Sequence, residues 1–430
     1  MFHPATQSPI WHPFTQHALE KEMKKIIKTE GAYLFDVKNQ PIFDAISSWW
    51  VITHGHRHPG IMDAICKACD HWDQIIFADF VHEPAEKLAN ELIKLAPKGL
   101  HYVFYSDSGS TAVEVALKMA IGYFKHIGQP RSRIIVMEHS YHGDTIGAMS
   151  VGERCVFNST YAPWLFEVDR IPFPVPGNEQ NTLDALLALC KTGSIAALLV
   201  EPLVLGAGGF KFYSPIILSE LRAITKTYNT LLIADEVMTG WGRTGTLFAC
   251  EQAKLTPDIL CTAKGLTGGA LPLAATLCAE PIFKAHYASD RTKTFFHSSS
   301  FTANPIATSA ALANIEIWKK EPVFQRIQSL EKMLQQQLEF FKTDERFLNV
   351  RQLGTIGALD VDVKSTGYLS DIGPKLRNFF GEQNLLMRPL GNVIYLMPPY
   401  CTTQVDLTRT FQLIDQAVDS IFPSQSIPAN

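Results

Sequence analysis

The sequence predicts an α/β protein in which a mostly parallel sheet carries helices on both faces, followed by a smaller α+β domain. Short β-rich apolar runs alternate with segments of helical periodicity from about residue 100 to residue 264. Such alternation is typical of parallel strands joined by helices. After about residue 305 the pattern changes to two long helical stretches and then short strands. At 430 residues the chain is too long for one compact core.

The elements are predicted in chain order from hydrophobic periodicity and from turn signals. Residues 31–47 hold two apolar runs around a Lys-Asn-Gln-Pro turn, which favours a hairpin. Helices are expected from about 59 to 75 and from 84 to 95, each starting at a proline. The alternating part that follows predicts strands at 101–105, 134–137, 195–200 and 231–234, with helices at 111–124 and 214–228.

The last part of the chain is predicted to form the smaller domain. Short strands are expected at 355–361, 385–388 and 393–396, and a final helix from about 405 to 422. We divide the chain into an N-terminal segment that joins the small domain (1–58), a large domain (59–305) and a C-terminal small domain (306–430).

Composition and charge exclude several classes of protein. Hydrophobic residues are 46% and charged residues 19%, as in ordinary globular enzymes. The net charge of −4 comes from interspersed acids and bases, so we expect no nucleic-acid partner. No apolar run reaches the roughly 18 residues of a membrane span, and the N-terminus lacks a secretory pattern. Eight scattered cysteines suit reduced thiols, and we expect a cytoplasmic protein.

Two patterns could suggest a metal site, but neither is complete. Cys66 and Cys69 form a C-x-x-C without a second ligand pair, and we expect them to pack within a helix. His54, His56 and His58 have no carboxylate or cysteine beside them in the sequence, and a predicted helix start follows them. We therefore predict no bound metal.

Two apolar runs end in a carboxylate and an amine. Asp235 ends the run Leu-Leu-Ile-Ala, and Lys264 follows Asp-Ile-Leu-Cys-Thr-Ala. Parallel sheets bind ligands at the carboxyl ends of their strands. A lysine amine can bind pyridoxal phosphate covalently, and an aspartate can hold the pyridinium nitrogen protonated. An ordinary buried ion pair is the alternative.

Three further segments follow predicted strands. Ser106 to Ser110 leads into the helix at 111–124, where N–H groups and the helix dipole suit a dianionic phosphate; ordinary N-capping is the alternative. Tyr141 can stack on a flat ring, and Val237 can cover the other ring face, although both could be core residues. Glu201 adds a carboxylate at the same edge, or caps a loop.

These segments resemble the class III, fold-type I aminotransferases that depend on pyridoxal phosphate. The resemblance rests on SDSGSTAVEVALKMA at 106–120, YHGDT at 141–145 and IADEVMTGWGRTG at 233–245, and it covers nearly the whole chain. WHPFT at 11–15, the Trp49-Trp50 pair and YLMPPY at 395–400 further resemble the family members that aminate 8-amino-7-oxononanoate.

The resemblance implies a role for each matching residue. Lys264 would bind the cofactor and then move the proton, and Asp235 would pair with the ring nitrogen. Tyr141 and Val237 would lie against the ring, while Gly109, Ser110, Ser299 and Ser300 would hold the cofactor, Ser300 from the other subunit of a homodimer. Substrate would contact Phe14, Trp49, Trp50, Tyr141, Lys264, Ser298 and Arg388, with the Arg388 guanidinium on its carboxylate.

Two departures from the family pattern fall at the substrate site. Members that use S-adenosylmethionine as amino donor typically carry Tyr where this chain has Phe14, and Gly-Pro-Thr where it has Ser298-Ser299-Ser300. Some relatives use lysine. S-Adenosylmethionine remains the preferred donor, with lysine as the alternative. Arg243 could serve loop structure or substrate carboxylates.

Two other functions remain to be weighed. Another aminotransferase of the same class would act on ornithine, 4-aminobutyrate or an ω-amino acid; the two tryptophans argue against it. A nucleotide-binding module would rest on the glycine loop at 206–209, which lacks the G-x-G-x-x-G spacing.

Overall fold

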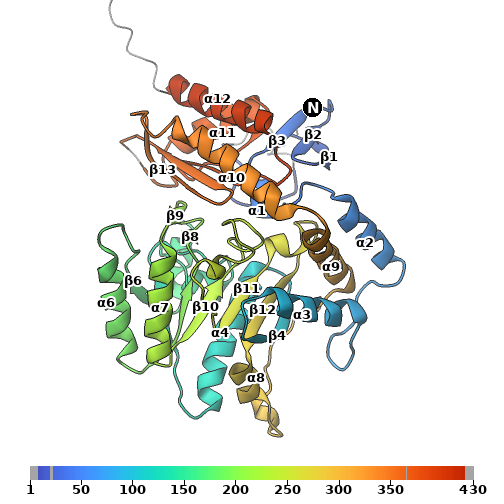
Figure 1. Cartoon of the computed structure of the whole chain (residues 1–430), viewed down its shortest axis with the longest axis vertical. Coiled ribbons are helices and arrows are strands. Elements are labelled where there is room, and N and C mark those ends of the chain that lie inside the picture. The colour runs from blue at the N-terminus through green and yellow to red at the C-terminus, as the bar shows by residue number, and fades with distance from the viewer. Residues whose placement is uncertain (1–7, 20–22, 365, 422–430) are drawn as a thin grey trace, which may run out of the picture.

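The fold was analysed in a computed structural model, which describes residues 8–19, 23–364 and 366–421. Figure 1 shows a large sheet with its helices in the lower part, and a second group of helices and strands above it. The upper group contains both ends of the described chain. The site considered below lies where the two groups face each other.

The large sheet confirms the predicted α/β arrangement. Among the described residues it has seven strands in the order β4-β12-β11-β10-β7-β5-β6. Strands β6, β5, β7, β10 and β11 run parallel, whereas β12 is antiparallel to both β11 and β4. The sheet strands are β4 (Leu100–Ser106), β5 (Arg133–Met137), β6 (Asp169–Ile171), β7 (Ile195–Val200), β10 (Leu231–Asp235), β11 (Ile259–Thr262) and β12 (Ala274–Ala279).

Helices cover both faces of this sheet, as predicted. From Ala197 to Val200 the side chains of β7 belong alternately to two apolar cores, so Leu198 packs with α6 and α7 while Leu199 packs with α4. Every residue of β7 is buried, which is the expected burial of a strand covered on two faces. The helices around the sheet are α2 (Pro59–Cys69), α3 (Glu83–Leu95), α4 (Gly109–His126), α5 (Ile146–Ser150), α6 (Glu179–Cys190), α7 (Pro215–Thr227), α8 (Glu280–His286) and α9 (Pro305–Lys320). Helix α9 packs against α2 and α3.

The upper group combines chain from both ends. Strand β15 (Leu385–Leu386) pairs in parallel with β3 (Pro41–Asp44), which forms the predicted hairpin with β2 (Tyr33–Asp36). Strand β1 (Ile26–Glu30) extends this sheet, and β13 (Phe347–Leu353), β14 (Ile356–Val361) and β16 (Val393–Leu396) form another. The upper group also contains the short turn α1 (Ser47–Trp50), α10 (Val323–Glu339), α11 (Ile372–Glu382) and α12 (Gln404–Ile421). The pair β8 (Val204–Leu205) and β9 (Lys211–Phe212) belongs to the lower group, as Figure 1 shows. Short 3-10 helices lie at Ser159–Trp164, Ala249–Glu251, Lys264–Thr267 and Arg291–Lys293.

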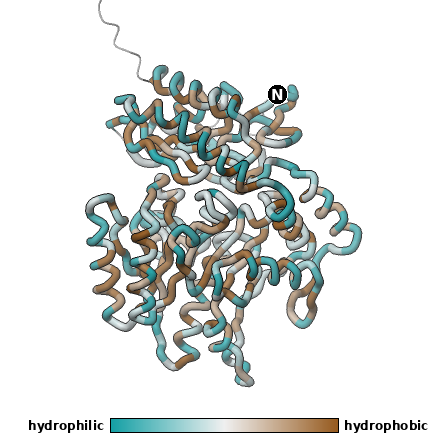
Figure 2. The backbone as a smooth tube through the Cα atoms, viewed as in Figure 1, coloured by the Kyte–Doolittle hydropathy of each residue, from teal (hydrophilic) through white to brown (hydrophobic). Residues whose placement is uncertain are grey.

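Apolar periodicity explains how the upper helices dock. Along α10 the residues Val323, Ile327, Leu330, Leu334 and Leu338 are buried at helical spacing. Hydrophobic and hydrophilic stretches alternate along these helices in Figure 2, as expected for helices with one face on a core. The boundaries 1–58, 59–305 and 306–430 remain a prediction.

Two expectations differ in detail from the structure. The helix expected to reach residue 75 ends at Cys69. Cys66 and Cys69 are both exposed, so the prediction that they pack inside was wrong: with 3.6 residues per turn, they share the outer face of α2. Among the described residues, none of the helices has the length and apolar character needed to cross a bilayer.

Candidate active site

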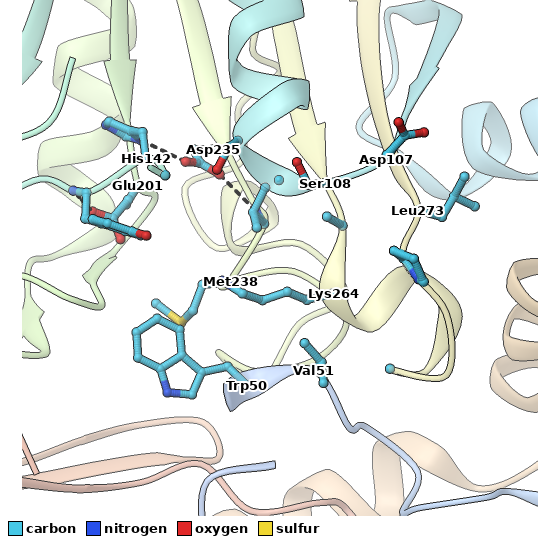
Figure 3. Close-up of a pocket in the computed structure, with 18 of the residues that line it drawn as sticks. Trp50, Val51, Asp107, Ser108, His142, Glu201, Asp235, Met238, Lys264 and Leu273 are labelled. Carbon is cyan, nitrogen blue, oxygen red and sulfur yellow. Dashed lines mark hydrogen bonds and ion pairs between the residues drawn. The ribbon is translucent and has the colours of Figure 1, made fainter. Parts of the chain in front are cut away.

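A cavity of about 410 Å³ opens at the carboxyl edge of the large sheet. It receives Asp235 from the end of β10, Lys264 from the turn after β11, and Ser108 to Ser110 from the start of α4. Tyr141 and Glu201 enter from the segments after β5 and β7. The structure therefore brings together residues that lie far apart in the sequence, as Figure 3 shows.

Lys264 lies at the centre of this cavity. Its side chain runs between the indole of Trp50 and the carboxylate of Asp235 (Figure 3), with Nζ 4.9 Å from the centroid of the Trp50 ring. Burial lowers the pKa of the Lys264 amine, and the nearby charge of Arg243 also lowers it. The charges of Asp235 and Glu201 raise this pKa, but by less than burial lowers it. A lowered pKa favours the neutral, nucleophilic amine.

Asp235 is held at the cavity wall by His142 and by Val237. Nδ1 of His142 donates to Oδ2 of Asp235 over 2.7 Å, and the backbone N–H of Val237 donates to Oδ1 over 3.1 Å. His142 and Asp235 are both buried, so the carboxylate has a fixed orientation. The side chain of Val237 also lines the cavity.

The N-terminus of α4 forms the anion end of the cavity. Ser108 caps this 18-residue helix, accepting from the N–H of Thr111 and donating its own N–H to the Thr111 hydroxyl. Gly109 and Ser110 follow at the first positions, where backbone N–H groups lack helical partners. The hydroxyl of Ser110 accepts the N–H of Asp144 over 3.3 Å, which ties this helix to the loop after β5.

Glu201 joins two of the loops at the cavity. Its carboxylate accepts the N–H of Tyr141 and the N–H of Gly206, each over 2.9 Å. Burial raises the pKa of Glu201 to about 7. Burial and the nearby Asp144 also raise the pKa of the Tyr141 phenol, which stays neutral.

A second cavity of about 330 Å³ adjoins the first and shares Trp50, Tyr141 and Lys264 with it. Phe14 and Trp49 line it, with ring centroids 5.4 Å apart. Arg388 lies at its wall, with the guanidinium carbon 5.1 Å from the centroid of the Trp49 ring and Nη2 donating to the carbonyl of Phe14 over 2.9 Å.

Ser298, Ser299 and Ser300 lie outside the lining of both cavities in this chain. The hydroxyl of Ser299 bonds the carboxylate of Asp107 at the cavity rim, and the carbonyl of Ser300 accepts from Gln74. The role of these serines across a subunit interface stays a prediction.

Arg243 has a structural environment. Its guanidinium is buried and donates to the carbonyls of Trp50, Ile52 and Pro398. These bonds join the loop after β10 to the end of α1 and to the segment that follows β16. The geometry favours the loop-structure alternative for Arg243.

Several residues of the two cavities were not singled out from the sequence. His142 bonds Asp235, 93 residues away, and only its place next to Tyr141 at a strand end could have signalled it. The first cavity also contains Met238 and Leu273. The second contains Phe157, Tyr368 and Leu390, which come from loops and carry no motif. It also contains Tyr395 of β16, which begins the YLMPPY segment but was given no role of its own.

The three histidines named as a possible metal site each bond another side chain. His54 bonds Asn314, His56 bonds Asp44, and His58 bonds Glu321. Within the described ranges, there is no group of three or more His, Cys, Asp or Glu arranged to hold a metal ion.

The first cavity fits pyridoxal phosphate. It presents an amine of lowered pKa, a buried carboxylate for a ring nitrogen, and a helix N-terminus for a phosphate. The start of α4 also packs closely on the opposite wall of the cavity, since a Cβ on Gly109 would meet the side chain of Val237. Lys264, Asp235, Gly109 and Ser110 are the residues that could hold it.

Comparisons with known proteins agree with this chemistry. The pattern of the family described as aminotransferase class-III matches residues 16–418. The adenosylmethionine-8-amino-7-oxononanoate aminotransferase of Synechococcus elongatus is 43% identical, over 96% of this chain and 99% of the relative. The protein of that name from Aquifex aeolicus is 36% identical, over 96% of this chain and 95% of its own length.

Solved structures of similar proteins have the same fold. The adenosylmethionine-8-amino-7-oxononanoate aminotransferase of Methanocaldococcus jannaschii superposes with a TM-score of 0.91 at 33% identity, covering 96% of this chain and 97% of that one. A PLP-bound amine transaminase from an uncultivated Pseudomonas species has a TM-score of 0.90 at 28% identity, covering 96% and 99%. The chain therefore belongs to the class III aminotransferases and is a pyridoxal phosphate-dependent aminotransferase.

Proposed function

We propose that this protein aminates 8-amino-7-oxononanoate to 7,8-diaminononanoate, a step of biotin synthesis. The observation that carries the proposal is the second cavity, which joins the Lys264 cavity and has an aromatic lining with one guanidinium. An extended apolar chain with a terminal carboxylate matches that lining, because aromatic side chains bury the chain and a guanidinium pairs with the carboxylate. The relatives named above carry this substrate in their names.

The residues of the chain have separate tasks in the reaction. When bound, the cofactor supplies an electron-withdrawing ring that stabilises negative charge on the carbon next to the amine. Asp235, oriented by His142, holds the ring nitrogen in its protonated form. The Lys264 amine removes a proton from the carbon of the donor and returns one to the carbon of the acceptor. Tyr141, Trp49 and Trp50 keep the acceptor in place and exclude water.

The amino donor is part of the proposal. S-Adenosylmethionine is the first choice, and lysine is the alternative suggested by Phe14 and by Ser298-Ser299-Ser300. A site built around a hydroxyl discriminates strongly on that group, so the missing hydroxyl at residue 14 bears directly on donor choice.

Single-turnover reaction of the pyridoxal form tests the function and the donor together. The purified protein is mixed with S-adenosylmethionine or with lysine, and pyridoxamine phosphate is followed by absorbance. The product of either reaction is then mixed with 8-amino-7-oxononanoate. Recovery of the pyridoxal form and appearance of 7,8-diaminononanoate support the proposal. Recovery only with the aldehydes formed by loss of the terminal amine of ornithine or 4-aminobutyrate would instead identify another aminotransferase of the class.

The assembly and the setting are also proposed. A cytoplasmic homodimer with Ser300 facing the partner's cofactor is consistent with the location of Ser298 to Ser300 outside their own cavities. We propose no nucleic-acid or membrane partner, and we retain the domain boundaries given above. Sedimentation of the holoenzyme tests the dimer, and a monomer with full cofactor occupancy would contradict it.

A further inference from the structure

A left-handed turn carries the tryptophan pair. Ser47, Ser48, Trp49 and Trp50 have φ angles of 53°, 46°, 78° and 74°. Left-handed backbone crowds the Cβ atom of an L-residue, and non-glycine residues visit it as single positions far more often than as a run. Residues 47–50 are four consecutive residues with positive φ, and none of them is a glycine. A conformation of this kind persists only where surrounding contacts hold it.

The side chain of Asp44 supplies four of those contacts, beside the bond from the Ser47 hydroxyl to the carbonyl of Met397. Oδ1 accepts the N–H of Ile46 over 3.3 Å and the N–H of Ser48 over 2.9 Å. Oδ2 accepts the hydroxyl of Ser48 and Nε2 of His56, each over 2.9 Å. Asp44 is fully buried and His56 is 8% exposed, so water has little access to the carboxylate. A buried carboxylate with four donors is tightly constrained.

The turn directs the two adjacent indoles to different walls of the second cavity. Trp50 is buried against Phe210 and Tyr395, donates Nε1–H to the Tyr395 hydroxyl over 3.2 Å, and lies next to the Lys264 amine. Trp49 is 38% exposed and lies between Phe14 and Arg388 in the second cavity. An extended strand would send successive side chains to opposite faces, and a right-handed turn would rotate them the other way. The left-handed turn is therefore what places both indoles at the substrate cavity.

We infer that Asp44, oriented by His56, is a positioning residue that holds the left-handed turn and so sets the shape of the substrate pocket. It touches neither cavity itself and acts through Trp49 and Trp50. The effect on substrate selection rests on the proposed function, because the long apolar chain is the part of the substrate that meets the two indoles. The control of the backbone conformation is independent of that function.

The Asp44→Asn variant tests this role in the holoenzyme. Asn keeps the size of the side chain but presents an NH₂ group to His56 and to the Ser48 hydroxyl. We expect KM for 8-amino-7-oxononanoate to rise by about tenfold while kcat falls by less than about threefold. The crystal structure of the variant should show residues 47–50 out of the left-handed region and Trp49 displaced.

Asp36→Asn is the matched control. Asp36 accepts the N–H groups of Lys38 and Gln40 at the turn between β2 and β3, in the same sheet as Asp44 but away from both cavities. We expect this variant to keep the wild-type KM. A folded Asp44→Asn protein with a left-handed turn and unchanged KM would overturn the inference.

Ser48→Ala decides the question if Asp44→Asn does not fold. It removes the hydroxyl bond to Oδ2 of Asp44 and the 3.5 Å contact of that hydroxyl with Nε2 of His56, and it keeps the bond from the Ser48 N–H to Oδ1. We expect KM for 8-amino-7-oxononanoate to rise by about threefold with kcat nearly unchanged. An unchanged KM would overturn the inference. If the wild-type protein did not use 8-amino-7-oxononanoate at all, the proposed function would fail, and the crystal structure alone would then decide whether Asp44 holds the turn.

Discussion

The side chain of Val237 lies against the Cα of Gly109, so closely that a Cβ on Gly109 would stand 2.6 Å from Cγ1 of Val237. Gly109 begins α4 at the anion end of the cavity, and the N–H of Val237 donates to the carboxylate of Asp235. The two ends of the proposed cofactor site are therefore packed directly on each other. This contact leads to the first prediction.

Gly109→Ala should weaken cofactor binding, because the added methyl must displace Val237 or shift the helix start. We expect Kd for pyridoxal phosphate to rise by about tenfold or more, in line with the cost of overpacking. Titration of the cofactor-free protein, followed by absorbance, measures this.

Two further variants make that result specific. Gly381→Ala is the matched control, since a Cβ at this position in α11 meets no atom within 4 Å, and its cofactor affinity should be unchanged. The double variant Gly109→Ala, Val237→Ala should recover part of the affinity. An unaltered Kd in Gly109→Ala alone would contradict the packing argument.

Asp235→Asn should lower kcat/KM by about two to three orders of magnitude. The amide keeps the shape of the side chain but removes the charge that holds a ring nitrogen protonated. Steady-state transamination measures the loss, and a circular dichroism spectrum equal to that of the wild type shows that the fold is kept. Turnover close to the wild-type value would rule out the assigned role.

Glu201 should make the stability of the cofactor-free protein depend on pH. Its pKa is raised to about 7 in the folded protein from an ordinary value of 4.5. Between these values the folded state binds more protons than the unfolded state, so the free energy of unfolding falls as pH rises from about 4.5 to 7.

Glu201→Gln removes this dependence. We expect the free energy of unfolding of the wild type, relative to the variant, to drop by about 3 kcal/mol from below pH ~4.5 to above pH ~7. Urea unfolding at a series of pH values measures it. A hydrogen bond lost in Glu201→Gln would lower the free energy of unfolding equally at every pH, so it does not affect the change with pH. If the free energies of wild type and variant ran parallel over the whole pH range, the prediction would be refuted.

Arg388→Lys should raise KM for 8-amino-7-oxononanoate by about tenfold or more, because an ammonium group cannot form the two parallel bonds of a guanidinium with a carboxylate. Arg409→Lys is the control, since Arg409 also donates to a backbone carbonyl, that of Gln383, but lies outside the lining of both cavities. Equal KM values in the two variants would argue against a carboxylate at Arg388.

Local pattern accounts for much of what the sequence predicted correctly. The buried runs that end at Asp235 and Lys264 are continuous in the chain, so their strands and their common edge could be inferred. The capped start of α4 is likewise a contiguous signal. Strand β12 was not foreseen, because Ala274–Ala279 follows β11 without a segment of helical spacing between them.

Contacts between distant segments explain what was missed. The bond between His142 and Asp235 depends on the strand order, which periodicity does not contain. The left-handed turn of Trp49 and Trp50 depends on the buried side chain of Asp44, and its residue types carry no signal for positive φ. The role assigned to Ser300 depends on a second chain, and the roles of Ser298, Ser299 and Ser300 stay predictions.

Reduction of the holoenzyme with borohydride, followed by peptide mass spectrometry, tests the central claim most directly. We expect one labelled peptide, with the pyridoxyl mass on Lys264, together with loss of both label and turnover in Lys264→Ala. Label on a different lysine, or full turnover by Lys264→Ala, would contradict the account.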